Sequence, residues 1–229
     1  GNTSYKSENQ MWIKASGKWL SNSEEEDIFV EVDLVKIHNN LKNNKSQPLK
    51  GSYIANKALR PSIETTLHAL MPHKVVLHSH PINLLCMLIL EDGESKLVKL
   101  LKDFNCTWVP YARPGQELTS KVQEATHLKH VDVLLLANHG LVVGAENSDQ
   151  AFNLMNNILN CCELIPRQQQ SPLNSLINKL AFQLDMRPPN NAAIHSLGLD
   201  EISYNYCNNK KSVMYPDQAV FFRAKIIMC

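Results

Sequence analysis

The chain has 229 residues, enough for one large domain or two small ones. Its 23 lysine and arginine residues nearly balance 22 aspartate and glutamate residues, for a formal charge of +1, which excludes the strong basic field that attracts nucleic acids or anionic membranes. No apolar run is long enough to span a bilayer, and no signal-peptide core stands at the start. We therefore expect a cytoplasmic protein that acts on a small molecule, with no nucleic-acid or membrane partner.

Short apolar runs typical of strands alternate along the chain with patterns typical of helices. Strands are predicted at 11–13, 28–32, 75–80, 108–109, 132–137, 141–143 and 219–222. A helix is predicted to begin at Pro61, because proline suits the first turn of a helix. A second helix is predicted over 151–162, where the apolar residues fall on one side and Ser148 or Asp149 can cap the start. This interleaving of strands and helices indicates an α/β protein.

Three histidines stand out because each lies at or near the end of a predicted buried strand. His78 and His80 are one residue apart on the extended segment 75–80, so their side chains project to the same side. His139 follows the apolar run 132–137 directly after Asn138. Three neutral imidazoles with one open position form the ligand set of a catalytic zinc site. The simpler alternative is that these rings bond to backbone carbonyls at strand ends.

A carboxylate accompanies the histidines in the sequence. Glu64 stands at the start of the predicted helix and precedes His78 by that helix and a short connection, so the two can converge. A carboxylate beside a bound cation can move a proton while the cation polarises a carbonyl, which is the machinery for breaking or making bonds next to a ketone. Its ordinary explanation is that negative charge is favoured at a helix start. His68, four residues after Glu64, is placed to hydrogen-bond it.

Six short motifs occur in one order along the chain: GNTS at 1–4, KASG at 14–17, PSIET at 61–65, LHSHP at 77–81, VPYARPG at 109–115 and ANHG at 137–140. Their order and spacing resemble those of the class II aldolase and adducin family from the first residue to about position 165, and more loosely over 215–220. The resemblance implies a single domain over 1–229 with a three-layer α/β fold, in which a central, mostly antiparallel sheet is flanked by helices.

The resemblance also implies an activity. The chain is similar to fuculose-1-phosphate and rhamnulose-1-phosphate aldolases, which implies a metal-dependent lyase that cleaves a ketose 1-phosphate to a dihydroxyacetone-phosphate-like product and an aldehyde. On this view His78, His80 and His139 hold one Zn²⁺ per chain, with another divalent metal as an alternative. Glu64 is then the acid/base residue.

Further residues receive roles from the same resemblance. Four residues are implied to surround the substrate phosphate: Asn2, Ser16, Gly17 and Ser62. Ile63 stands where many family members have a second serine, which removes one hydrogen-bonding group and leaves open whether the substrate is phosphorylated. Tyr111 matches a tyrosine that protonates the aldehyde oxygen across a subunit interface, which implies a homotetramer. The pattern over 110–115 also resembles aldolase domains that some bacteria fuse to a dehydrogenase, and we expect this chain to end before such a domain.

The same metal site would serve other reactions. Dehydratases, epimerases and decarboxylases of related sugars use it, although Glu64 argues against the epimerases, whose corresponding residue is usually aspartate. An adducin-like interaction domain would keep the scaffold without the chemistry, and would be expected to lose the ligands that are present here. Fold alone does not choose among these reactions, because a few pocket residues set them.

Overall fold

The computed structural model describes residues 1–43, 45–53, 59–127, 129–165, 174–187, 200–201, 205 and 214–217. The chain divides into two compact units, Gly1–Glu163 and Leu164–Cys229, and each is described by itself. The expectation of a single domain over 1–229 stays a prediction. The strand predicted at 219–222 lies outside the described residues.

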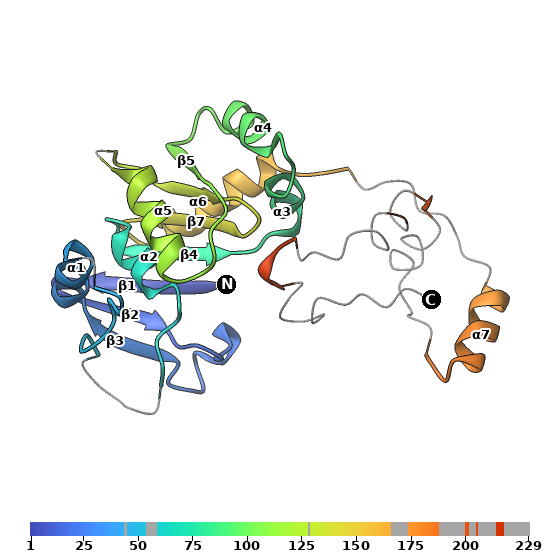
Figure 1. Cartoon of the computed structure of the whole chain (residues 1–229), viewed down its shortest axis with the longest axis horizontal. Helices are drawn as coiled ribbons and strands as arrows, with labels where there is room; N and C mark the ends of the chain where they lie inside the picture. Colours follow the sequence, from blue (N-terminus) through green and yellow to red (C-terminus); the bar gives the residue numbers. More distant parts are fainter. Residues whose placement is uncertain are drawn as a thin grey trace. The chain divides into compact units, whose positions relative to one another are not determined.

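The first unit is built on one seven-stranded sheet in the order β3-β2-β1-β4-β7-β6-β5 (Figure 1). The strands are β1 (Asn2–Ser7), β2 (Gln10–Lys14), β3 (Phe29–Asp33), β4 (Val75–Ser79), β5 (Cys106–Val109), β6 (Val133–Leu136) and β7 (Gly140–Ala145). Every neighbouring pair is antiparallel except β5 and β6, which are parallel. The predicted mostly antiparallel sheet is therefore confirmed.

Helices cover both faces of this sheet. They are a 3-10 turn η1 (Leu20–Asn22), α1 (Leu34–Lys42), α2 (Thr65–Leu70), α3 (Ile82–Leu88), α4 (Gly93–Leu100), α5 (Gln116–Thr126) and α6 (Ser148–Cys161). On one face, α1, α2 and α5 bury apolar side chains against strand residues such as Met11, Val76 and Leu134. On the other face, α6 packs on β4 and β7, with Met155 against Ser79. The result is the predicted three-layer α/β arrangement.

The second unit contains one described α-helix, α7 (Asn174–Gln183). Across the described parts of both units, every helix is too short or too polar to span a bilayer.

Strand β1 was not predicted, because its buried side chains are polar. Asn2, Ser4 and Lys6 alternate inward along it, so the apolar period-two signal of a half-buried strand is missing. Each of these polar groups finds a partner. Ser4 Oγ hydrogen-bonds His68 Nδ1 at 2.8 Å, and the Lys6 ammonium donates to two backbone carbonyls. The partners remove most of the penalty of burying polar groups.

Two helix starts differ from the prediction. The helix predicted from Pro61 begins at Thr65, because Pro61 instead forms an isolated bridge with Ala15. This places Glu64 just before the helix rather than inside its first turn. Helix α6 is capped by Asn147, whose side chain accepts from the backbone N–H of Gln150 at 2.9 Å, and not by Ser148 or Asp149. A side-chain N-cap typically has extended backbone geometry, which Asn147 has.

Candidate active site

The sheet brings the three predicted histidines together at one end of its central strands. His78 lies near the end of β4, His80 directly after it, and His139 in the turn between β6 and β7. Because β4 pairs with β7 and Ser79 is opposite Leu141, the end of one strand lies beside the start of the other. The ring centroids are 4.7, 5.0 and 5.2 Å apart.

Local backbone geometry makes this close approach possible. Asn138 has a φ of 52°, a left-handed conformation that asparagine tolerates better than most residues. Gly140 leaves the space for the rings, since a Cβ there would lie 2.7 Å from His80 Cδ2 and 3.2 Å from His78 Cε1. The turn 138–140 thus sets both the direction of His139 and the room for His78 and His80.

The ring atoms fit one metal ion. His78 Nδ1 donates to the carbonyl of Leu141 at 2.9 Å, which in a neutral ring leaves the lone pair on Nε2, as in metal-bound histidines. His78 Nε2 and His80 Nε2 are 2.9 Å apart, close to the separation of about 3.3 Å expected between two nitrogens on a tetrahedral zinc ion. One ligand atom from each of the three residues lies within 4.8 Å of the others.

The carboxylate of Glu64 joins the same cluster. Its Oε1 is 3.3 Å from His78 Nε2 and 3.0 Å from His139 Nε2. Four ligand-type atoms therefore converge. With the ring proton of His78 on Nδ1, its Nε2 carries a lone pair and faces the carboxylate oxygen of Glu64, so this contact brings two acceptor atoms together. A divalent cation satisfies every one of these lone pairs, so the donor set fits a metal.

In the metal-free protein, burial by itself would raise the pKa of Glu64, but positive charge on His78 and His139 and their hydrogen bonds to the carboxylate outweigh it and hold the pKa well below its ordinary value. The carboxylate is therefore ionised and acts as an acceptor. Its position is fixed by a local turn, in which Ser62 Oγ accepts from the Glu64 N–H at 3.3 Å and the Ser62 carbonyl accepts from Thr65 Oγ1 at 2.6 Å.

The four residues expected around a phosphate lie on segments next to this cluster. Asn2 is buried on β1 directly opposite His78. Ser16 follows β2, and its N–H donates to the carbonyl of Arg60 at 2.8 Å, which ties this turn to the strand-like segment before Ser62. Gly17 has a φ of +77°, and its Cα faces open space. Whether these residues bind phosphate stays a prediction.

Tyr111 lies outside the buried cluster. Its side chain is 58% exposed on the 110–115 loop. That loop returns close to the active-site turn, because a Cβ at Gly115 would lie 3.5 Å from the side chain of Ile63. Ile63 itself is 61% exposed. Its contribution to the site is a surface apolar group beside Glu64, with no polar atom to offer a ligand.

Two polar residues near the site were missed or misjudged from the sequence. Lys14 is buried at the end of β2, where burial lowers its pKa and the nearby charge of Glu64 partly offsets that effect. The one feature of the sequence that could have identified Lys14 is that a charged residue ends an apolar strand. His68 does not hydrogen-bond Glu64 as expected but Ser4, and its complete burial lowers its pKa to about 3. Ser4 could not be anticipated as its partner without strand β1.

Comparison with known proteins identifies the family of this chain. Residues 1–165 match the family described as Class II Aldolase and Adducin N-terminal domain. The chain belongs to this family. A curated relative from Bacillus subtilis (strain 168), the uncharacterized oxidoreductase YuxG, is 31% identical over 149 residues, which are 62% of this chain and 21% of that protein. The chain thus spans about a fifth of the length of that relative.

Solved structures agree on the fold. The N-terminal class II aldolase domain of a conserved protein from Thermoplasma acidophilum is 27% identical, with a TM-score of 0.61 over 70% of this chain and 81% of that one. YgbL from Escherichia coli, a putative aldolase/epimerase/decarboxylase, is 21% identical, with a TM-score of 0.52 over 82% of this chain and 80% of that one. The predicted family and fold class are both confirmed.

Proposed function

We propose that this protein is a zinc-dependent sugar-phosphate aldolase, a lyase that cleaves a ketose 1-phosphate into a dihydroxyacetone-phosphate-like ketone and an aldehyde. One observation carries the proposal. A carboxylate oxygen of Glu64, whose side chain is 11% exposed, lies 3.3 and 3.0 Å from two imidazoles of a three-histidine cluster that fits a divalent ion. Family membership supports it, because class II aldolases are among the proteins with this domain.

His78, His80 and His139 would hold the metal, which when bound polarises the substrate carbonyl and stabilises the negative charge that develops on its oxygen. In the direction of synthesis, the Glu64 carboxylate takes a proton from C3 of the ketone, and the electron pair left on C3 forms the bond to the aldehyde carbon. The aldehyde oxygen then receives a proton and becomes the C4 hydroxyl. Cleavage is the reverse, so a proton moves from the C4 hydroxyl to C3 without any net change of charge.

Tyr111 is proposed as the donor of the proton to the aldehyde oxygen. Since its side chain is 58% exposed and lies outside the cluster of its own chain, we propose that it serves the site of a neighbouring copy in a cytoplasmic homotetramer. Ser62, Asn2, Ser16 and Gly17 are proposed to contact the phosphate. Ser62 Oγ already accepts from the Glu64 N–H, so its hydroxyl proton remains available for an anion.

The test is product analysis with a panel of ketose 1-phosphates from both stereochemical series. Dihydroxyacetone phosphate and aldehyde should appear together and in equal amounts. Glu64→Gln should lower turnover by about 10²- to 10⁴-fold while zinc content is retained, because a positioned acid/base group supplies a factor of this size. The matched control is Glu117→Gln, which changes an exposed glutamate in the first turn of α5 and should leave turnover unchanged.

Other outcomes replace the proposal in defined ways. Consumption of substrate without dihydroxyacetone phosphate, with loss of water or carbon dioxide or with an inverted centre, would assign a dehydratase, decarboxylase or epimerase to the same site. Equal turnover in the wild type and Glu64→Gln would remove the acid/base role. If the purified protein held no zinc and the His78→Ala, His80→Ala double variant behaved like the wild type, an adducin-like interaction domain would be the better description.

A further inference from the structure

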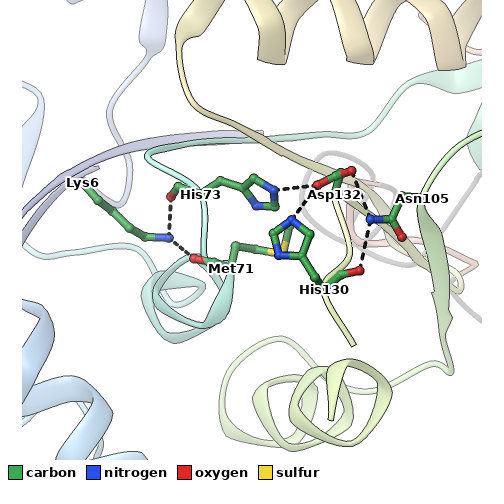
Figure 2. A network of polar contacts seen from close by, with 6 residues as sticks. All are labelled: Lys6, Met71, His73, Asn105, His130 and Asp132. Carbon is green, nitrogen blue, oxygen red and sulfur yellow. Dashed lines mark hydrogen bonds and ion pairs between the residues drawn. The ribbon is translucent and has the colours of Figure 1, made fainter. Parts of the chain in front are cut away.

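A second group of possible metal ligands lies outside the active site. It consists of His73, His130 and Asp132, and each offers one ligand atom within 4.8 Å of the others. Figure 2 shows the two imidazoles directed at one carboxylate oxygen, with Asp132 Oδ1 2.8 Å from His73 Nε2 and 3.2 Å from His130 Nε2. The two rings are 5.1 Å apart, the same spacing as the active-site histidines.

The topology explains why these residues meet. Strands β4 and β6 are both antiparallel to β7, so they run in the same direction. His73 precedes β4 and Asp132 precedes β6, whereas His80 and His139 follow these strands. The second group is therefore at the opposite end of the same strands from the active site, and an ion there would not contact the substrate.

Surrounding hydrogen bonds hold the ligands in place. The Asn105 amide donates to Asp132 Oδ2 and to the carbonyl of His130, both at 3.1 Å, as Figure 2 shows. Lys6 donates from the neighbouring strand to the carbonyl of His73 at 3.1 Å. The bond from Asn105 to the Asp132 carboxylate is of the kind that orients ligating side chains in known metal sites. The carboxylate and both histidine backbones are thus fixed before any ion arrives.

The ring of His73 is also wedged in one orientation. It is buried, and a Cβ on Gly144 would lie 2.3 Å from its Nδ1. With Nδ1 packed against this glycine, the ring keeps Nε2 directed at Asp132. His130 is different, since its side chain is 65% exposed, so one side of the group remains open to water.

We propose that His73, His130 and Asp132 bind a second divalent transition-metal ion, of which Zn²⁺ is the representative. Two imidazole nitrogens and one carboxylate oxygen suit zinc, cobalt or nickel, whereas magnesium and calcium require more oxygen ligands. Water would complete the coordination on the exposed side. An ion at this place links the segments that enter β4 and β6, so its effect is on stability.

The second ion is expected to bind more weakly than an ideal site would allow. His73 Nδ1 has no hydrogen-bond partner among the described residues, and a metal on Nε2 moves the ring proton to this atom. A metal-bound histidine that lacks such a partner loses about 10- to 100-fold in affinity. Occupancy should therefore require about 10- to 100-fold more free zinc than a site in which this atom has a partner. Magnesium should not occupy the site, because it requires more oxygen ligands.

The experiment is equilibrium dialysis of the full chain against buffered zinc, followed by metal analysis and thermal unfolding. His130→Ala removes an exposed ligand, so folding is spared, and His127→Ala is the control because it removes an exposed histidine of the same region that belongs to neither group. We expect His130→Ala to bind one zinc ion fewer per chain than the wild type and His127→Ala. Zinc at ten times the dissociation constant should raise Tm by about 3–6 °C in His127→Ala, and this gain should be smaller in His130→Ala.

The two sites are separated by testing the same substitution in the His78→Ala, His80→Ala background. If the proposal holds, this double variant keeps one ion that His130→Ala then removes, whatever activity the enzyme has. Equal zinc content and equal Tm gain in His130→Ala and His127→Ala would overturn the second site.

Discussion

Gly140→Ala tests whether the tight approach of the histidine rings is needed for the proposed metal binding at the candidate active site. A Cβ at this position would lie 2.5 Å from the carbonyl oxygen of Ser79, 2.7 Å from His80 Cδ2 and 3.2 Å from His78 Cε1. The carbonyl belongs to the adjacent strand and cannot move without breaking sheet hydrogen bonds. The turn around position 140 must therefore shift, and the imidazoles that pack against it are displaced as well. Overpacking of this kind costs about 1–3 kcal/mol, which for a chain of this size lowers Tm by about 2–12 °C.

The expected effect on metal binding is larger than this loss of stability suggests. Displacing two of the three ligands should lower the affinity of the candidate active site for zinc by at least about 10- to 100-fold, the loss that a disturbed ligand orientation causes in known sites. Zinc affinity is measured by competition with a chromophoric chelator, and metal-free stability by thermal unfolding in excess chelator. The matched control is Gly144→Ala on the same strand, whose Cβ would collide with His73 Nδ1 at 2.3 Å instead. It should lose similar stability but keep the zinc ion of the candidate active site. If Gly140→Ala bound that ion as tightly as the wild type, the packing argument would be refuted.

Three further predictions follow from buried polar groups. Burial lowers the pKa of His68 to about 3, so below about pH 6.5 the unfolded chain binds a proton at this residue and the folded chain does not. The free energy of unfolding, measured in urea, should therefore fall by up to about 1.4 kcal/mol for each pH unit below 6.5. An equally steep fall in His68→Gln would contradict this prediction. Burial lowers the pKa of Lys6 to about 7, from 10.5 in the unfolded chain. Between pH 7 and 9 the unfolded chain therefore holds a proton that the folded chain has lost, so the free energy of unfolding should rise with pH in the wild type and stay flat in Lys6→Met. An equal rise in both proteins would assign the effect to another group. Ser62→Ala should raise KM for a phosphorylated sugar by about 10-fold or more, with little change for its unphosphorylated analogue; equal changes for both would exclude a phosphate contact.

The sequence predicted the apolar strands well and the polar one not at all. Strands β2, β4, β6 and β7 contain alternating or continuous apolar residues, and such patterns arise directly from burial. Strand β1 buries polar side chains whose partners come from residues more than sixty positions away, as with Ser4 and His68. A local pattern cannot report a partner so distant, so a strand stabilised by such pairs has no apolar signature.

The candidate site shows the same division. His78 and His80 share a side because of the period of a strand, which can be predicted from two residues alone. The convergence with His139 depends on the pairing of β4 with β7, and family resemblance, not periodicity, linked them. The position of Glu64 was predicted only approximately, because the bridge between Ala15 and Pro61 that delays the helix is a contact between distant segments.

Burial separates the expected roles of the two histidine groups. The Glu64 side chain is 11% exposed, so water screens its charge less than it screens an open surface carboxylate. Asp132 is 35% exposed beside a His130 side chain that is 65% exposed, and water there weakens any field that could assist a reaction. Water exclusion is what lets fixed charges stabilise a transition state, whereas it is not needed for an ion that only links two segments of chain. The same two strands, β4 and β6, can therefore support chemistry at one end and metal-dependent stability at the other.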